Sequence, residues 1–480
     1  MVEKSIILYT MSEKKPFYIT TTLPYVNGTP HIGFALEIIE ADVLARFKKS
    51  LGHPVIFNTG TDEHGINIYR KAEELGQDTQ DYTDKVSLQF QELKELLNLS
   101  YTNFVRTTDE AHIKAAQEFW RRSDANGDIY KKAYKIKYCS GCELEKTDSE
   151  LSDDGRCELH PSKEIETINE ENYFFRWSKY QEALLTLYKE KPQFVLPKKR
   201  LNEIESFVER GLQDFSISRL RAKLPWGVPV PGDEDHVMYV WFDALVSYIS
   251  TLGWPDQEEA FEKWWPGVQI AGKDNLRQQA AMWQAMLCSV GLPFSEQVLI
   301  NGFINVDGQK MSKSLGNVIT PQEMVDRFGT DGTRYLLLTL AHLGEDSDMS
   351  WERATEKYNA DLANGLGNLV SRVIKLAEKM TEYPAYEVVG NTLEITNQSV
   401  FEYTAKIMEQ VREANEYMSR EEPWMLVKTD QTAFAGVMRV LLRQLSVIAG
   451  QLEILMPETA EKIQTALKAG KTEPLFQRIA

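Results

Sequence analysis

The sequence predicts an α/β fold, in which a parallel sheet is split by an insertion and followed by an α-helical bundle. Three observations predict it. Apolar, β-prone runs alternate with helical patterns from residue 17 to 124 and again from residue 237 to about 300. A polar stretch with three of the four cysteines separates these regions, and the pattern is helical from about residue 320. Strands that alternate with helices are typical of a parallel sheet with helices on its faces.

The alternation could come from one split sheet or from two separate α/β domains. Each half alone has too few strands for a stable sheet, which favours the split sheet. The expected segments are a first half at 15–125, an insertion at 126–236, a second half at 237–303, a connecting region at 304–358 and a helical bundle at 359–480. The second half is expected to open with a strand at 237–240.

The composition is that of an ordinary globular protein, and it excludes some classes of function. A net charge of −17 argues against nucleic-acid binding driven by bulk charge, but it allows a local basic face. No apolar run of about 18 residues occurs, so we expect no membrane span. Three cysteines close together and one alone are not a disulfide scaffold, which favours a reducing cytoplasm.

The first candidate site is the turn Leu23-Pro-Tyr-Val-Asn-Gly-Thr-Pro-His-Ile-Gly-Phe34, between a predicted strand and a predicted helix. The start of a helix offers free backbone N–H groups and a positive dipole end to an anion. His31 could donate a hydrogen bond there, and Gly33 would let a flat ring or a phosphate approach the backbone. A capped helix with a surface histidine is the alternative interpretation of this stretch taken alone.

Two further loops carry polar side chains. Gly60-Thr-Asp-Glu-His-Gly65 follows the predicted strand at 55–59, and ligands bind at the carboxyl ends of such strands. Lys310-Met-Ser-Lys-Ser314 follows a predicted hairpin, whose turn is Asp307-Gly308. Two lysines and two serines in one loop suit a polyphosphate. An exposed basic turn is the alternative.

The predicted insertion contains a candidate metal site. Cys139 and Cys142 form one pair, Cys157 and His160 form a second pair with the same spacing, and 14 residues lie between the pairs. Two such knuckles suit tetrahedral Zn²⁺, and four protein ligands make a closed, structural site. A redox pair or free structural cysteines are the alternatives.

Together these motifs resemble those of the class I aminoacyl-tRNA synthetases. His31-Ile-Gly-Phe34 resembles the first signature of the class, and Lys310-Met-Ser-Lys-Ser314 matches the second. The zinc knuckle, the loops at 23–28 and 60–65 and Tyr239-Val-Trp-Phe-Asp-Ala244 narrow the resemblance to the methionyl-tRNA synthetase family. It runs from about residue 16 to the end and implies a split Rossmann fold.

The resemblance implies an enzyme that activates methionine with ATP and then transfers it to the 3′ end of its tRNA. Positioning and charge stabilisation would do most of the catalysis. The implied catalytic residues are His31, Lys310 and Lys313. The implied ATP site adds Gly33, Glu37, Gly272 and Asp274, with Mg²⁺ on the triphosphate.

The resemblance also implies sites for methionine and for tRNA. The implied methionine pocket is Leu23, Tyr25, Asp62, Trp241, Ala244 and Tyr248, with Arg219 near the active site. Asn368, Arg372 and Trp424 match positions that read the anticodon of initiator and elongator methionine tRNA. Because the chain ends soon after the bundle, without the dimerising appendage of some relatives, we expect a monomer.

Three residues depart from the family pattern. Phe34 replaces the second histidine of the first signature, Asn275 replaces a branched apolar residue, and Gln279 replaces a histidine near the methionine. They leave two alternatives: a catalytically impaired paralogue that acts as an RNA-binding module, and a class I ligase for another apolar amino acid. The insertion is too short for a large editing domain, which argues against a ligase for leucine or valine.

Overall fold

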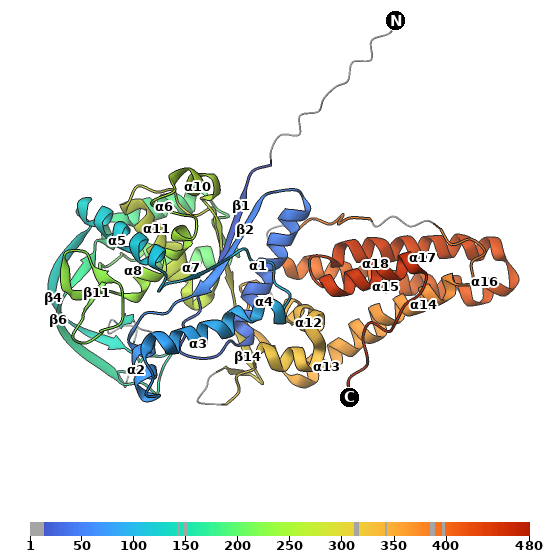
Figure 1. The fold of residues 1–480 in the computed structure, drawn as a ribbon, viewed down its shortest axis with the longest axis horizontal. Helices are drawn as coiled ribbons and strands as arrows, with labels where there is room; N and C mark the ends of the chain where they lie inside the picture. The colour runs from blue at the N-terminus through green and yellow to red at the C-terminus, as the bar shows by residue number, and fades with distance from the viewer. Residues whose placement is uncertain are drawn as a thin grey trace, which may run out of the picture.

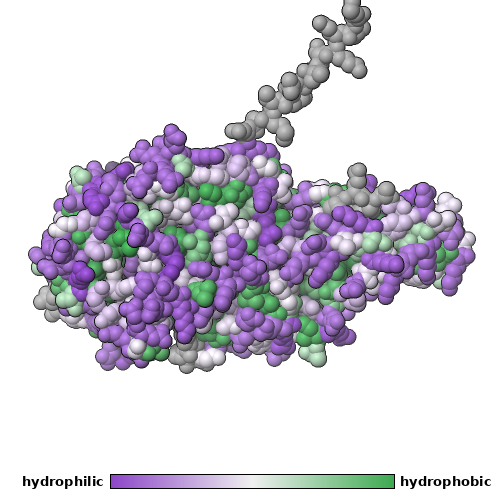
Figure 2. All heavy atoms as spheres, viewed as in Figure 1, coloured by the Kyte–Doolittle hydropathy of each residue, from purple (hydrophilic) through white to green (hydrophobic). Residues whose placement is uncertain are grey.

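An α/β body and a helical bundle that extends from one side of it make up the molecule (Figure 1). The computed structural model describes residues 14–141, 144–146, 151–152, 154–311, 316–340, 343–384, 389–395 and 399–480. Both regions have a mostly hydrophilic surface on the face seen in Figure 2, with hydrophobic residues in scattered patches.

A six-stranded parallel sheet forms the centre of the body, in the order β3-β2-β1-β12-β13-β7. Its strands are β1 (Phe17–Thr21), β2 (Val55–Thr61), β3 (Asn103–Arg106), β7 (Val195–Leu196), β12 (Val268–Gly272) and β13 (Gln297–Asn301). Because β1 pairs with both β2 and β12, the two halves of the sequence build one sheet. The split-sheet prediction is confirmed, and the alternative of two separate α/β domains is wrong.

Both faces of this sheet are buried, as a parallel sheet requires. Ile19 and Ile270 belong to a core that continues into the bundle, while their strand neighbours Tyr18 and Ala271 belong to the opposite core. The helices of the body are α1 (Ile32–Ser50), α2 (Ile66–Glu74), α3 (Thr79–Gln91), α4 (Leu93–Leu96), α5 (Glu110–Ala125), α6 (Gln181–Glu190), α7 (Lys198–Glu209), α8 (Val240–Ala244), α9 (Ser247–Ser250), α10 (Glu258–Trp264) and α11 (Trp283–Ser289).

The segment between the two halves forms mainly antiparallel structure. The long strands β4 (Ile129–Cys139) and β6 (Ile165–Phe175) pair along their whole length, with β5 (Leu144–Lys146) and β8 (Phe215–Ser216) at the edges. A second sheet contains β9 (Ser218–Leu220), β10 (Pro229–Val230) and β11 (Asp233–Met238).

Two features of this segment differ from the sequence-based expectation. The strand expected at 237–240 is not part of the parallel sheet, because β11 pairs with β9 in the antiparallel direction and α8 begins at Val240. The predicted insertion at 126–236 does not lie wholly outside the parallel sheet, since its two-residue strand β7 pairs with β13.

The predicted hairpin after the sheet is confirmed. Strand β14 (Ile304–Val306) pairs with β15 (Gln309–Lys310), and Asp307 and Gly308 both have positive φ angles, 51° and 73°. Two positive φ values in a two-residue loop match the twist of the flanking strands. A third strand, β16 (Ser347–Met349), lies parallel to β14 on its other side.

The C-terminal bundle is helical, as predicted. Its helices, including those that connect it to the body, are α12 (Pro321–Leu340), α13 (Trp351–Lys357), α14 (Asn368–Ala377), α15 (Val400–Glu421), α16 (Pro423–Thr429), α17 (Gln431–Leu452) and α18 (Pro457–Ala469). Helix α17 is long and apolar enough to cross a membrane. It packs against α15, α16 and α18, so its apolar face is covered by the bundle itself.

Arg334 joins the bundle to the body. Its side chain, on α12, is fully buried, and its Nη2 donates to Asp42 Oδ2 of α1 at 2.7 Å. The same guanidinium donates to the carbonyls of Leu97, next to α4, and of Leu455, between α17 and α18, at 2.9 and 2.7 Å. One side chain therefore satisfies groups from three separate parts of the chain.

Removing this guanidinium should weaken the junction strongly. We expect Arg334→Met to lower the free energy of unfolding by roughly 3–5 kcal/mol, because Asp42 loses a buried partner. Urea unfolding followed by circular dichroism measures the change. Arg353→Met is the matched control, since Arg353 pairs with Asp348 at the surface. Its replacement should lower the free energy of unfolding by less than about 1 kcal/mol. Equal unfolding midpoints for the two variants would contradict this role of Arg334.

Candidate active site

The loops after β1 and β2 lie side by side at the carboxyl edge of the sheet. The N–H of Val26 donates to the carbonyl of Asp62 at 3.1 Å, and the N–H of Asp62 donates to the carbonyl of Pro24 at 3.0 Å. These bonds bring Tyr25 next to Asp62, in parallel register. Leu23 and Tyr25 are half-buried and Asp62 is buried, so the loops present these three side chains at one place.

The His31 turn meets the segment that carries Lys310. The N–H of Ile32 donates to the carbonyl of Ile319 at 3.0 Å. A Cβ on Gly33 would lie 3.8 Å from Met311 Cε. Lys310 is exposed, and its ammonium lies 4.5 Å from the centre of the Phe303 ring. The two motifs are therefore adjacent, although Lys313 itself lies outside the described residues.

Gly33 also makes room for the histidine before it. His31 caps α1, and its Nδ1 accepts the Gly33 N–H at 3.1 Å. A Cβ on Gly33 would lie only 2.9 Å from His31 Cε1, which is closer than real Cβ atoms come. Glycine at this position thus allows the imidazole to fold over the first turn of the helix.

Glu37, one turn further along α1, is buried beside the end of β1. Its Oε1 accepts the N–H and the hydroxyl of Thr22, at 2.7 and 2.6 Å. Burial raises the pKa of Glu37 to about 8, the Thr22 bonds oppose the rise, and the nearby carboxylates of Asp274 and Glu40 add to it. Asp274 is exposed and follows Gly272, the last residue of β12, so the ends of β1 and β12 share this region.

Two short helices that precede β12 carry the remaining predicted pocket residues. Trp241 and Ala244 lie on α8 and Tyr248 lies on α9. Burial raises the pKa of Tyr248, and the charges of Glu37 and Asp62 raise it further, which places its hydroxyl at the same sheet edge. Tyr248 therefore lies near Glu37 and Asp62, and helix α8, which carries Trp241 and Ala244, is joined to the 60–65 loop through Asp243 and His64.

The residues that depart from the family pattern take different places. Phe34 is buried, and its ring packs edge-on against Phe90 at 5.6 Å between centroids, so this position belongs to the core. Asn275 is half-buried beside Asp274. Gln279 is buried, and its Nε2 donates to the Tyr248 hydroxyl at 2.7 Å.

A buried polar network behind the pocket was missed by the sequence-based prediction. Asp243, on α8 between Trp241 and Ala244, contacts His64 Nδ1 at 2.6 Å and His112 Nε2 at 2.7 Å. Burial alone would raise the pKa of Asp243, but the two histidines lower it to about 2. The network links the 60–65 loop to α5 and α8. His112 is a lone histidine in an amphipathic helix, and such a residue does not by itself predict a contact with a distant carboxylate.

An ion pair also holds the 60–65 loop. Glu63 lies next to Asp62 and accepts two hydrogen bonds from Arg106 of β3, at 2.7 and 2.8 Å. Such bidentate pairs are the strongest hydrogen-bonded ion pairs in proteins. The loop is thus held directly after Asp62, by Glu63 and by His64.

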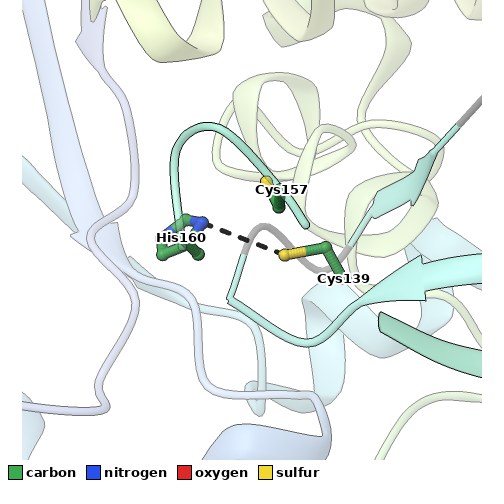
Figure 3. A group of neighbouring side chains, drawn as sticks. All are labelled: Cys139, Cys157 and His160. Carbon is green, nitrogen blue, oxygen red and sulfur yellow. Dashed lines mark hydrogen bonds between the residues drawn. The ribbon is translucent and has the colours of Figure 1, made fainter. Parts of the chain in front are cut away.

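Three of the four predicted metal ligands form a cluster (Figure 3). The ligand atoms of Cys139, Cys157 and His160 all lie within 4.8 Å of one another, with Cys139 Sγ 4.0 Å from His160 Nδ1. A Cβ on Gly141 would lie 2.5 Å from the His160 ring, so the backbone needs glycine there. Cys142 lies outside the described residues. Two thiols and an imidazole at this spacing fit a zinc-type metal.

The predicted anticodon residues also come together, in the bundle and away from the sheet. Asn368 and Arg372 are one turn apart on α14, and the Arg372 guanidinium lies 5.2 Å from the Trp424 ring centre on α16. Asn368 is exposed, while Arg372 and Trp424 are half-buried. Helix α16 is at the far end of the bundle in Figure 1.

A split parallel sheet whose edge holds both the His31 turn and the Lys310 hairpin defines a class I aminoacyl-tRNA synthetase. A sequence family described as "tRNA synthetases class I (M)" matches residues 17–158 and 146–374. A second, described as "Anticodon binding domain of methionyl tRNA ligase", matches residues 394–477. The chain belongs to the methionyl-tRNA synthetase family.

Proteins similar to this chain are named methionine–tRNA ligases or methionyl-tRNA synthetases. The methionine–tRNA ligase of Thermosynechococcus vestitus is 41% identical over 93% of this chain and 89% of its own length. That of Brucella melitensis is 40% identical over 96% of this chain and 93% of its own length. The Mycobacterium tuberculosis methionyl-tRNA synthetase, solved in complex with methionyl-adenylate, superposes with a TM-score of 0.87. It is 36% identical and covers 94% of this chain and 93% of its own.

The raised pKa of Glu37 predicts a pH dependence of stability. The folded protein keeps the proton up to about pH 8, whereas the unfolded chain releases it near pH 4.5. Glu37 therefore contributes to the free energy of unfolding in full below pH 4.5, and this contribution is lost as the pH rises to about 8. The difference in pKa corresponds to roughly 1.4 kcal/mol per pKa unit. We expect Glu37→Gln, which keeps an acceptor for Thr22, to flatten this fall in urea titrations between pH 5 and 8.5.

The exposed Glu461 provides the control for this experiment. Glu461→Gln should leave the pH dependence of the wild type unchanged. A Glu37→Gln protein that loses as much stability as the wild type over this range would show that Glu37 is ionised when folded.

Proposed function

We propose that this chain activates methionine with ATP and transfers it to methionine tRNA. The observation that carries the proposal is the contact between the His31 turn and the Lys310 hairpin, at the sheet edge where Tyr25 and Asp62 meet. Membership in the methionyl-tRNA synthetase family and the methionine–tRNA ligases at about 40% identity support it.

The first step needs positioning more than acid–base chemistry. The methionine carboxylate is already ionised and attacks the α-phosphorus of ATP, so that a new P–O bond forms while the bond to pyrophosphate breaks. His31, Lys310 and Lys313 hold the phosphates and stabilise the charge that develops on them. Mg²⁺, when bound to the triphosphate, neutralises part of that charge.

The nucleoside part of ATP lies along the other half of the sheet edge. Gly33 gives the adenine ring access to the start of α1, and Asp274, beyond Gly272, accepts hydrogen bonds from the ribose. Glu37 faces the nucleotide, and at neutral pH its raised pKa keeps it largely protonated, so that it adds no charge repelling the phosphates. In the second step the 3′-terminal hydroxyl of the tRNA attacks the methionyl carbonyl, and AMP leaves.

The amino acid binds between the two halves of the sheet. The Asp62 carboxylate pairs with the substrate ammonium, while Leu23, Tyr25 and Ala244 shape the pocket. Trp241 and Tyr248 pack on the thioether, because sulfur makes favourable contacts with aromatic rings. The His64–Asp243 pair supports this arrangement from behind.

The bundle and the knuckle have separate tasks. Asn368, Arg372 and Trp424 read the anticodon by hydrogen bonding and by stacking on unpaired bases. A structural Zn²⁺ on Cys139, Cys142, Cys157 and His160 holds the insertion together. A cytoplasmic location and a monomeric state stay predictions.

The relatives favour this function over the two alternatives. The impaired RNA-binding paralogue is motivated by Phe34 alone, and Phe34 fills a core position. The exposed Lys310 on its hairpin also suits a phosphate clamp, which a silent paralogue would not need. A ligase of another amino acid is disfavoured, because every relative named above is a methionine enzyme.

Methionine-dependent exchange between ATP and pyrophosphate tests the activity directly. We expect exchange with methionine and none with leucine or valine. Lys310→Ala should lower the exchange rate by roughly 10²–10³-fold, the usual cost of one lost transition-state donor. Lys85→Ala, at an exposed lysine on α3, should not change it. Absence of exchange at saturating methionine would refute the function.

Metal analysis tests the knuckle. The freshly purified protein should contain one zinc per chain. Cys157→Ser should lose the ion and make the insertion more sensitive to proteases, since structural zinc contributes folding energy. Cys288→Ser, on α11 and outside the cluster, should keep the ion. A wild-type protein without zinc would refute the assignment of the knuckle as a zinc site.

A further inference from the structure

The ammonium group of Lys310 rests on an aromatic ring at the base of its own hairpin. Lys310 Nζ lies 4.5 Å from the centre of the Phe303 ring, and a second ammonium, that of Lys273, lies 4.2 Å from the same centre. The face of an aromatic ring attracts cations. Phe303 directly precedes β14 and Lys310 ends β15, so the ring and the ammonium meet across the hairpin.

The second ammonium comes from the segment that is proposed to bind the ribose. Lys273 stands between Gly272 and Asp274, where β12 ends at the carboxyl edge of the sheet. The function proposed above uses Gly272, Asp274 and Lys310, but it gives no role to Lys273 or to Phe303. The shared ring therefore joins the hairpin that carries Lys310 to the nucleoside side of the candidate ATP site.

A carboxylate allows the two cations to share one ring. Lys273 Nζ donates to Asp346 Oδ2 at 2.6 Å, and Asp346 Oδ1 accepts the backbone N–H of Phe303 at 2.9 Å. Burial opposes the charge on Asp346, but these two bonds and the charge of Lys273 outweigh it and lower the pKa of the carboxyl. The carboxylate balances the charge of Lys273, which reduces the repulsion that Lys310 meets at the ring.

The contact restricts a side chain that is otherwise flexible. Lys310 is exposed, and a lysine stem has many rotamers in solvent. The Phe303 ring is half-buried, and the backbone N–H of the same residue is bound to Asp346, so the ring has a defined place. An ammonium that rests on this ring is therefore kept at the sheet edge before any phosphate binds.

We propose that Phe303 is a positioning residue for the activation step, and that its ring holds the Lys310 ammonium beside the ATP site until the lysine binds the phosphates. Asp346 and Lys273 support the ring in this role. Part of the entropy of fixing Lys310 is then lost before the reaction, which lowers the cost of reaching the transition state. The inference rests on the proposed function, because the ring has this role only if Lys310 acts on the phosphates.

A double-mutant cycle separates positioning of Lys310 from general support of the fold. The quantity to measure is kcat of methionine-dependent exchange between ATP and pyrophosphate. Phe303→Leu keeps an apolar side chain but removes the ring face, and we expect it to lower kcat by roughly three- to tenfold. In a Lys310→Ala background the same change should alter kcat by less than about twofold, because no ammonium is left to position. Phe303→Tyr keeps the ring and should retain the wild-type kcat.

Asp346→Asn carries the same test without a change in the ring. The amide oxygen can still accept the backbone N–H, but the charge of Lys273 is no longer balanced, so Lys310 is repelled from the ring. We expect kcat to fall in the same range, and again only while Lys310 is present. Glu345→Gln is the matched control, because the neighbouring Glu345 pairs with Lys199 and both side chains are exposed. Its kcat should equal that of the wild type.

The outcomes distinguish the inference from the proposed function. If the wild type catalyses exchange, but Phe303→Leu and Asp346→Asn lower kcat by the same factors with and without Lys310, these residues only support the fold and the inference is refuted. Variants as fast as the wild type, or faster, would also refute it, and in both cases the proposed function stands. If the wild type itself catalyses no exchange, the proposed function fails and the inference fails with it.

Discussion

The buried ion pair between Arg334 and Asp42 is the constraint on which the arrangement of the two regions depends. Burial opposes the charge on Asp42, but Arg334 and Arg46 outweigh it and lower the pKa of the carboxyl. Because Asp42 belongs to α1, the helix that begins at His31 and carries Glu37 is anchored to the bundle at its middle. The bundle, which matches the anticodon-binding family, and the sheet edge at the start of α1 are therefore joined through one helix.

The active site is assembled from loops whose positions are fixed by the parallel sheet. The ends of β1, β2 and β12 meet at one edge, and backbone bonds join the loop after β1 to the loop after β2. Buried polar groups then hold the loops from behind, with Asp243 between two histidines and Glu63 on Arg106. In the chemistry proposed here, catalysis depends on placement.

The sequence predicted the parts of the fold and site that have local signals. Motif residues such as His31 and Lys310 stand in short segments with distinctive spacing, and the bundle helices have clear periodicity. Strand β7 was not predictable, because two residues show no periodicity, and the strand at 237–240 has the same apolar pattern whichever partner it pairs with. Asp243 gave no signal either, since its partner His112 is 131 residues away in the sequence.

The close approach of Gly33 to His31 has a consequence for how this motif can vary among relatives. The missing side chain at position 33 leaves space for the protein's own imidazole as well as for a nucleotide. An alanine there would meet the His31 ring, and it would also fill the space proposed for the nucleotide. Loss of the histidine would therefore relieve only one of the two constraints that keep position 33 small.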